Sequence, residues 1–263
     1  MRREVGAELE LRTEGDATAL LSIAVSSAHP LIAESLAVTR DGVEQPVDEL
    51  VGPHGARLHE LDLGAGVTRV SYAATVDVAP TASVGALDAW TFTRPSRYCE
   101  SDRLAATAQA EFDGLAGVDL LDAVSSWVGT RLEYVPGSSG PTDGAVQTLL
   151  QRTGVCRDYA HLVVALLRAR GVPARLVSVY APGLDPMDFH AVAEALIDER
   201  WLVVDATTLA PRSSLVRIAT GRDAADTAFL TSRGAAVTLE RMEVTAVADT
   251  LPDDDVREGV ELS

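Results

Sequence analysis

The sequence predicts an α+β protein, in which an N-terminal antiparallel β-sandwich is followed by helices packed on a second antiparallel sheet. Two observations lead to this prediction. Residues 1 to about 80 alternate apolar and polar side chains in short segments separated by turn residues, as antiparallel strands do. From about residue 95 the apolar residues first follow a helical spacing and then alternate again. Helices that precede a group of strands favour an α+β fold over a doubly wound sheet.

The composition narrows the possible functions. The 263 residues suffice for one large or two ordinary domains, and 47% hydrophobic with 23% charged residues is typical of soluble globular proteins. A formal net charge of −17 argues against binding nucleic acid or an anionic membrane through charge. No apolar run has the length of a membrane span, and the N-terminus lacks the apolar core of a signal peptide. We therefore expect a cytoplasmic protein with no membrane or nucleic-acid partner.

The cysteines and histidines of the sequence do not indicate a metal site or a disulfide. The two cysteines, Cys99 and Cys156, form neither a zinc-binding pattern nor a disulfide framework. His54 and His59 are poorly spaced as metal ligands and have no matching cysteine pair. We expect no metal and no cofactor.

The N-terminal domain is predicted to span residues 1–85. Turn residues such as Asp41-Gly42 and Gly52-Pro53 separate its strands. The predicted strands lie at residues 7–12, 18–25, 35–40, 56–63 and 67–78. Small and polar residues 78–85 form a linker, and we interpret the domain as a structural or substrate-presenting module.

The second domain is predicted to span residues 95–248, followed by an acidic, frayed tail at residues 249–263. Its predicted helices cover residues 102–112, 119–132 and 142–151 and a long helix that begins at residue 156. Its predicted strands cover residues 174–180, 189–197, 201–206 and 236–247. The stretch 211–221 has weak periodicity, and residues 221–226 are interpreted as an ordered turn.

A cysteine opens the long helix. Ala160, Val163 and Leu167 follow Cys156 at helical spacing, so the thiol lies on the stripe that packs inward. The helix is predicted to end at Gly171. A thiol at a helix N-terminus meets the positive end of the helix dipole, which favours the thiolate. The alternative is that Cys156 is a small buried residue, which is the interpretation we give Cys99.

A nucleophilic cysteine needs an imidazole and gains from a third group that orients it. His161 lies five residues along the helix and points away from Cys156, whereas His190 begins a later strand. A tight turn at residues 198–199 would place Asp205 opposite Val192 and diagonal to His190 on one face.

Several acids could orient His190. An acid at the end of the apolar strand 201–204 is costly unless it is paired, and this makes Asp205 the preferred partner. Its alternative role is a turn cap together with Thr207. The competing acids are Asp185, Asp188 and Glu194.

Three separated blocks together resemble the bacterial transglutaminase-like superfamily. They are Gly154-Val155-Cys156-Arg157-Asp158-Tyr159-Ala160-His161-Leu162 with Arg168-Ala169-Arg170-Gly171-Val172-Pro173-Ala174-Arg175, then His190-Ala191, then Trp201-Leu202-Val203-Val204-Asp205-Ala206-Thr207. The resemblance covers roughly residues 100 to 210, and the N-terminal strands resemble the β-rich domain that often precedes this core. It implies a papain-like α+β core with a catalytic triad of Cys156, His190 and Asp205.

The resemblance also implies acyl transfer from a peptide, protein or small amide through a thioester. We expect a hydrolase of the protease or amidase type. The alternatives are a transamidating transglutaminase and a catalytically silent peptide-binding scaffold. The oxyanion would be bound by the backbone N–H of Cys156 and by a side chain of Gln151, Trp127 or Tyr134. Substrate identity and oligomeric state stay open.

Overall fold

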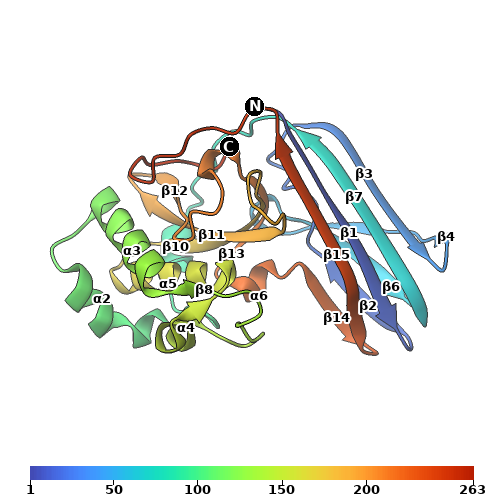
Figure 1. Ribbon diagram of the computed structural model, residues 1–263, viewed down its shortest axis with the longest axis horizontal. Helices are drawn as coiled ribbons and strands as arrows, with labels where there is room; N and C mark the ends of the chain where they lie inside the picture. Colours follow the sequence, from blue (N-terminus) through green and yellow to red (C-terminus); the bar gives the residue numbers. More distant parts are fainter.

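Two antiparallel sheets form a β-sandwich on one side of the molecule, and a helical region covers a third sheet on the other side (Figure 1). The computed structural model describes residues 1–263. The first sandwich sheet has the order β15-β1-β7-β3-β4 and the second the order β14-β2-β6-β5. The N-terminal strands are β1 (Arg3–Thr13), β2 (Ala17–Leu21), β3 (Leu31–Arg40), β4 (Val43–Glu44), β5 (Asp48–Val51), β6 (Arg57–Leu63) and β7 (Gly66–Val76).

The alternation in the sequence explains the sandwich core. In β1 and β7, alternate apolar side chains are buried between the sheets, and the intervening polar ones face solvent. Leu11, Val70 and Leu21 are among the fully buried members of this core. The predicted α+β fold with an N-terminal antiparallel sandwich is confirmed.

The sandwich also contains residues 230–248, which we predicted to belong to the second domain. The predicted domain boundary at residue 248 is therefore corrected. β15 (Val237–Ala248) pairs antiparallel with β1, and β14 (Leu230–Gly234) pairs with β2. Residues 230–248 therefore complete the first domain rather than close the second. An edge strand exposes unpaired N–H and C=O groups, and β15 satisfies those of β1.

The third sheet, of order β12-β11-β10-β13, is covered by α5 and α3 on one face. Its strands are β10 (Ala174–Tyr180), β11 (Phe189–Ile197), β12 (Arg200–Val204) and β13 (Val216–Gly221). The helices are α1 (Asp88–Thr91), α2 (Ala105–Phe112), α3 (Gly117–Arg131), α4 (Ala145–Gln151), α5 (Cys156–Ala169) and α6 (Ala224–Thr227). Every residue of α5 from Asp158 to Arg168 is buried, so this helix is the centre of the second core.

β13 was not expected from the weak periodicity of residues 211–221. All six residues of β13 are buried on both faces of the sheet. A strand of this kind lacks the alternation of buried apolar and exposed polar residues by which strands are recognised in a sequence. The strand pairs with β10 and also contributes Val216 and Ile218 to the sandwich core. The Tyr180 hydroxyl donates to the carbonyl oxygen of Ile23 at 2.8 Å. The sandwich core therefore extends onto one face of the sheet that contains β10 and β13.

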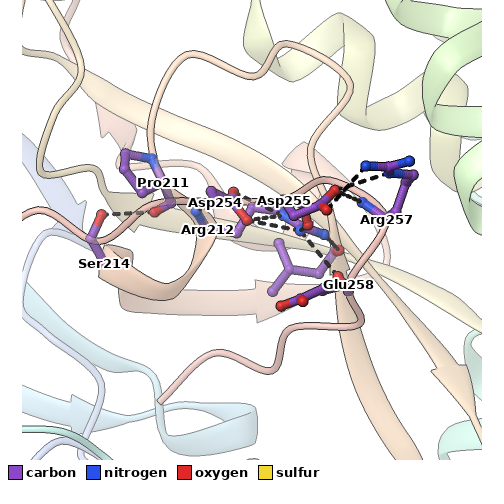
Figure 2. Close-up of polar contacts among 8 residues, drawn as sticks. Pro211, Arg212, Ser214, Asp254, Asp255, Arg257 and Glu258 are labelled. Carbon is purple, nitrogen blue, oxygen red and sulfur yellow. Dashed lines mark hydrogen bonds and ion pairs between the residues drawn. The ribbon is translucent and has the colours of Figure 1, made fainter.

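The acidic tail is ordered against the third sheet, contrary to the expectation that residues 249–263 fray. The side chain of Arg212 donates to both carboxylate oxygens of Asp254 and to the carbonyl oxygens of Asp255 and Glu258 (Figure 2). The N–H of Val203 donates to the carbonyl oxygen of Val260 at 2.7 Å. The five N–H donors of a buried arginine can bind several acceptors at once, and these hydrogen bonds hold the tail against β12.

None of the helices combines the length and the apolar character that crossing a bilayer requires.

Candidate active site

Cys156 is the first residue of α5, and the local sequence builds the turn that presents it. Asp158 accepts the N–H of Val155 at 2.8 Å through one carboxylate oxygen and the hydroxyl of Ser139 at 2.9 Å through the other. A Cβ on Gly154 would lie 2.7 Å from the Cβ of Asp158, so only glycine allows this approach. Asp158 thus caps the helix, and Cys156 is left partly exposed at its end.

His190 lies on β11, and Asp205 directly follows β12 in the predicted register. Asp198 and Glu199 both have positive φ angles, 48° and 60°, as a two-residue hairpin turn of this kind requires. Ala193 pairs with Val204, so the register places Asp205 opposite Val192. The short turn fixes the register, because a slip of one residue would send Asp205 to the opposite face.

The imidazole and the carboxylate are in direct contact. Nε2 of His190 lies 2.8 Å from Oδ2 of Asp205, and both side chains are almost fully buried. Oδ1 of Asp205 accepts the N–H of Thr207 at 2.9 Å and its hydroxyl at 2.7 Å. Asp205 therefore fills both roles considered for it, as the partner of His190 and as the cap of the turn at Thr207.

The electrostatics of this pair favour imidazolium beside carboxylate. Burial alone would favour neutral His190, but the charge and hydrogen bond of Asp205 and the nearby Cys156 raise the pKa of His190 to about 10. Burial likewise opposes ionisation of Asp205, yet His190 and Thr207 keep the pKa of Asp205 below its usual value. Nδ1 of His190 has no hydrogen-bond partner, so this nitrogen is available to Cys156.

Of the three side chains considered for the oxyanion, only Tyr134 lies beside Cys156. β8 (Glu133–Tyr134) pairs in parallel with β9 (Thr153–Gly154), which brings Tyr134 next to the loop that carries the cysteine. Burial and the adjacent Cys156 raise the pKa of Tyr134 to about 12, so its hydroxyl keeps its proton at neutral pH.

Trp127 and Gln151 are placed elsewhere. The indole N–H of Trp127 donates to Glu111 at 2.7 Å, and the ring lies under Arg131. Gln151 is exposed at the end of α4, and its side chain forms no hydrogen bond. None of the three side chains, Tyr134 included, lines the cavity beside Cys156, so the position of Tyr134 next to the cysteine is what distinguishes it.

The competing histidine is occupied in another part of the structure. Nε2 of His161 accepts the N–H of Ala224 at 3.1 Å, and the ring stacks on Tyr98. Burial lowers the pKa of His161 to about 3, so it stays neutral. Cys99 is fully buried, and burial raises the pKa of its thiol.

Two of the competing acids are also occupied, and the third, Asp185, is exposed and forms no hydrogen bond. Glu194 accepts hydrogen bonds from Arg175 at 2.7 Å and from Arg217 at 2.6 Å. Asp188 accepts the N–H of Phe189 at 2.7 Å. The segment 221–226 is ordered: Asp223 accepts the N–H of Tyr98 at 2.8 Å and caps α6.

A cavity of about 600 Å³ opens beside Cys156 and His190. Its lining includes Phe229, Leu230 and Ser22, which no sequence motif connected to the site.

No group of three or more His, Cys, Asp or Glu side chains is arranged to hold a metal ion.

Comparison with known proteins finds a family profile that matches part of the chain and a structure that matches nearly all of it. A sequence profile described as the Transglutaminase-like superfamily matches residues 103–206, a range that includes Cys156, His190 and Asp205. A crystal structure from Cytophaga hutchinsonii, named a "Putative Cysteine Protease", has a TM-score of 0.89 and 31% sequence identity to this chain. The match covers 99% of this chain and 96% of that chain.

Two uncharacterised mycobacterial proteins are similar over part of their length. The protein of Mycobacterium leprae is 30% identical over 138 residues, which are 48% of this chain and 50% of that protein. The protein of Mycobacterium bovis is 35% identical over 125 residues, which are 41% of this chain and 40% of that protein. The matches thus span half or less of these relatives' own lengths.

Proposed function

The chain belongs to the transglutaminase-like superfamily, and from this membership we propose that it transfers acyl groups from amide or peptide substrates through a thioester on Cys156. Water would accept the acyl group, which makes the protein a hydrolase of the protease or amidase type. The observation that carries the proposal is the buried contact between His190 and Asp205, which leaves Nδ1 of His190 available beside Cys156.

In the first half of the reaction, Nδ1 of His190 takes the proton of the Cys156 thiol, and Asp205 stabilises the imidazolium. The thiolate attacks the amide carbonyl, and the carbonyl oxygen becomes an oxyanion. The backbone N–H of Cys156 and the hydroxyl of Tyr134 are the proposed donors to it. As the C–N bond breaks, His190 returns its proton to the departing amine, and the thioester remains.

In the second half, a water molecule donates a proton to Nδ1 of His190 and attacks the thioester carbonyl. The C–S bond breaks, the carboxylic acid leaves, and His190 returns the proton to the sulfur. An amine in place of water would give transamidation by the same steps.

Trapping the acyl-enzyme tests the proposal. The protein is mixed with peptides or activated esters, quenched in acid, and its intact mass and the modified peptide are measured. The sequence contains no lysine, so acylation of side-chain amines cannot obscure a thioester. We expect an acyl adduct on Cys156 that is absent from Cys156→Ala. A wild-type protein that forms no more adduct than Cys156→Ala contradicts the proposal and favours a silent scaffold.

Competition between acceptors separates hydrolysis from transamidation. With a trapped acyl-enzyme, we expect release of the free acid in the presence of millimolar methylamine. Formation of the N-methyl amide as the main product would instead support the transamidating alternative.

A further inference from the structure

The cavity beside Cys156 is built by both halves of the molecule. The third sheet contributes Leu176, Phe189 and Ile218, and the segment that enters β14 contributes Phe229 and Leu230. Since β14 pairs with β2, the sandwich holds this second group in place. In Figure 1, α6 lies between the helical region and β14, where the chain passes from one half to the other.

Two aromatic rings hold the apolar part of the lining. Phe189 and Phe229 stack with their ring centres 5.6 Å apart, and Phe189 also packs on Tyr180. The N–H of Ser22 donates to the carbonyl oxygen of Phe229 at 2.9 Å, which anchors this residue to the sandwich. A rigid aromatic surface of this kind is suited to an apolar group of the substrate.

Small side chains leave the space open. The lining contains four alanines, and a larger residue at any of them would take up part of the volume. They are Ala191, Ala224, Ala225 and Ala228. The resulting 600 Å³ exceeds what one water molecule or a methyl group needs.

The charge of the lining is opposite to that of the whole chain. No aspartate or glutamate lines the cavity, although the net charge is −17. The lining instead contains Arg157, which donates to the carbonyl oxygen of Gly140 at 2.7 Å and lies 3.6 Å from the Asp158 carboxylate. The carboxylates that pair with Arg157 and with His190 lie outside the lining, so a cationic substrate side chain would meet the guanidinium and the imidazolium but no carboxylate in the cavity wall.

We propose that this cavity selects acyl donors that carry a large apolar side chain, aromatic or branched aliphatic, next to the reacting carbonyl. The proposal rests on the acyl-transfer function proposed above. It assigns Phe189, Phe229 and Leu230 as specificity residues and makes the β-sandwich part of the substrate site.

Three p-nitrophenyl esters test the preference: 3-phenylpropionate, acetate and 6-aminohexanoate. The Cys156 sulfur forms the thioester bond, its proton passes to His190, and the ester C–O bond breaks to release p-nitrophenolate, which is followed by absorbance. Each acylation rate constant is divided by that of free cysteine, which removes differences in intrinsic reactivity. We expect the phenylpropionyl ester to exceed each of the other two at least ~10-fold, the discrimination typical of an apolar pocket.

A variant that fills the cavity tests whether the cavity sets this preference. Ala228 is exposed at the cavity wall, so Ala228→Trp places an indole there without disturbing a packed core. We expect it to lower the ratio of phenylpropionyl to acetyl rate constants about 10-fold. Ala110→Trp, on an exposed position of α2 outside the cavity, is the matched control and keeps the wild-type ratio. Phe229→Ala is a second variant, and it lowers the same ratio by removing the aromatic wall.

The outcomes separate the two proposals. A wild-type protein that reacts with all three esters alike, or a ratio unchanged in both Ala228→Trp and Phe229→Ala, overturns the specificity proposal alone. If none of the esters reacts faster with wild type than with Cys156→Ala, the acyl-transfer proposal falls and this one falls with it.

Discussion

The Asp205 carboxylate lies 2.8 Å from Nε2 of His190, and Thr207 holds the other oxygen of that carboxylate. Two strands joined by a two-residue turn thus deliver an oriented imidazole to the end of the cysteine helix. This arrangement fixes which ring nitrogen faces Cys156, and its consequences can be measured.

Asp205→Asn keeps an oxygen for Thr207 but removes the charge beside His190. We expect the acylation rate to fall about 10²- to 10⁴-fold, because the imidazolium loses its stabilising partner. Stopped-flow release of p-nitrophenolate measures the effect. Asp102→Asn makes the same chemical change on an exposed side chain and serves as the control. A rate within twofold of wild type would argue against a catalytic role for Asp205.

The same pair makes stability depend on pH. The pKa of His190 is raised to about 10 in the folded protein, compared with about 6.5 in an unfolded chain. Its contribution to stability is therefore complete below about pH 6.5 and is lost as the pH rises toward 10. Urea unfolding between pH 6 and 10 should show a loss of stability that is smaller in Asp205→Asn. An identical loss in both proteins contradicts the assignment.

Tyr134→Phe removes the proposed second oxyanion donor without changing the ring. We expect the rate of acylation to fall about 10²-fold with little change in substrate affinity, since the hydroxyl acts mainly in the transition state. Trp127→Phe is the comparison, because its indole N–H already donates to Glu111. A larger loss in Trp127→Phe than in Tyr134→Phe would reverse the assignment.

Alkylation should distinguish the two cysteines. Cys156 is partly exposed, whereas Cys99 is fully buried and burial raises the pKa of its thiol. Iodoacetamide at neutral pH should therefore label Cys156 first, as peptide mass mapping would show. In urea both residues should react, which controls for detection. Equal, slow labelling in the folded protein would count against a reactive Cys156.

The ion pair between Arg212 and Asp254 should stabilise the C-terminal tail. Asp254→Asn leaves the buried guanidinium without its charge partner, and we expect a loss of about 1–3 kcal/mol in the free energy of unfolding. Asp255→Asn is the control, because the Asp255 side chain pairs with Arg257 at the surface. The backbone carbonyl of Asp255 that Arg212 binds is unchanged in this control (Figure 2). Equal urea midpoints for both variants would exclude a stabilising role for the pair.

Local patterns determined much of this protein. The apolar stripe behind Cys156 predicts a buried helix, and the two-residue turn at Asp198 sets the register that joins His190 to Asp205. Helix stripes and hairpin registers depend on residues a few positions apart, so the sequence carries their signal directly.

Only the tertiary structure decided the features made by distant segments. β15 pairs with β1 across more than 200 residues, Tyr134 reaches Cys156 through two paired residues of β8 and β9, and Phe229 meets Phe189 in the cavity. The tail lies along β12 because buried Arg212 donates hydrogen bonds to carbonyl oxygens of the tail. These contacts join segments that are far apart in the chain, and the local sequence of a segment does not indicate which other segment it will contact. The contacts therefore depend on how the whole core packs together. By itself the sequence determined the candidate nucleophile and its base; the fold decided which residues surround them.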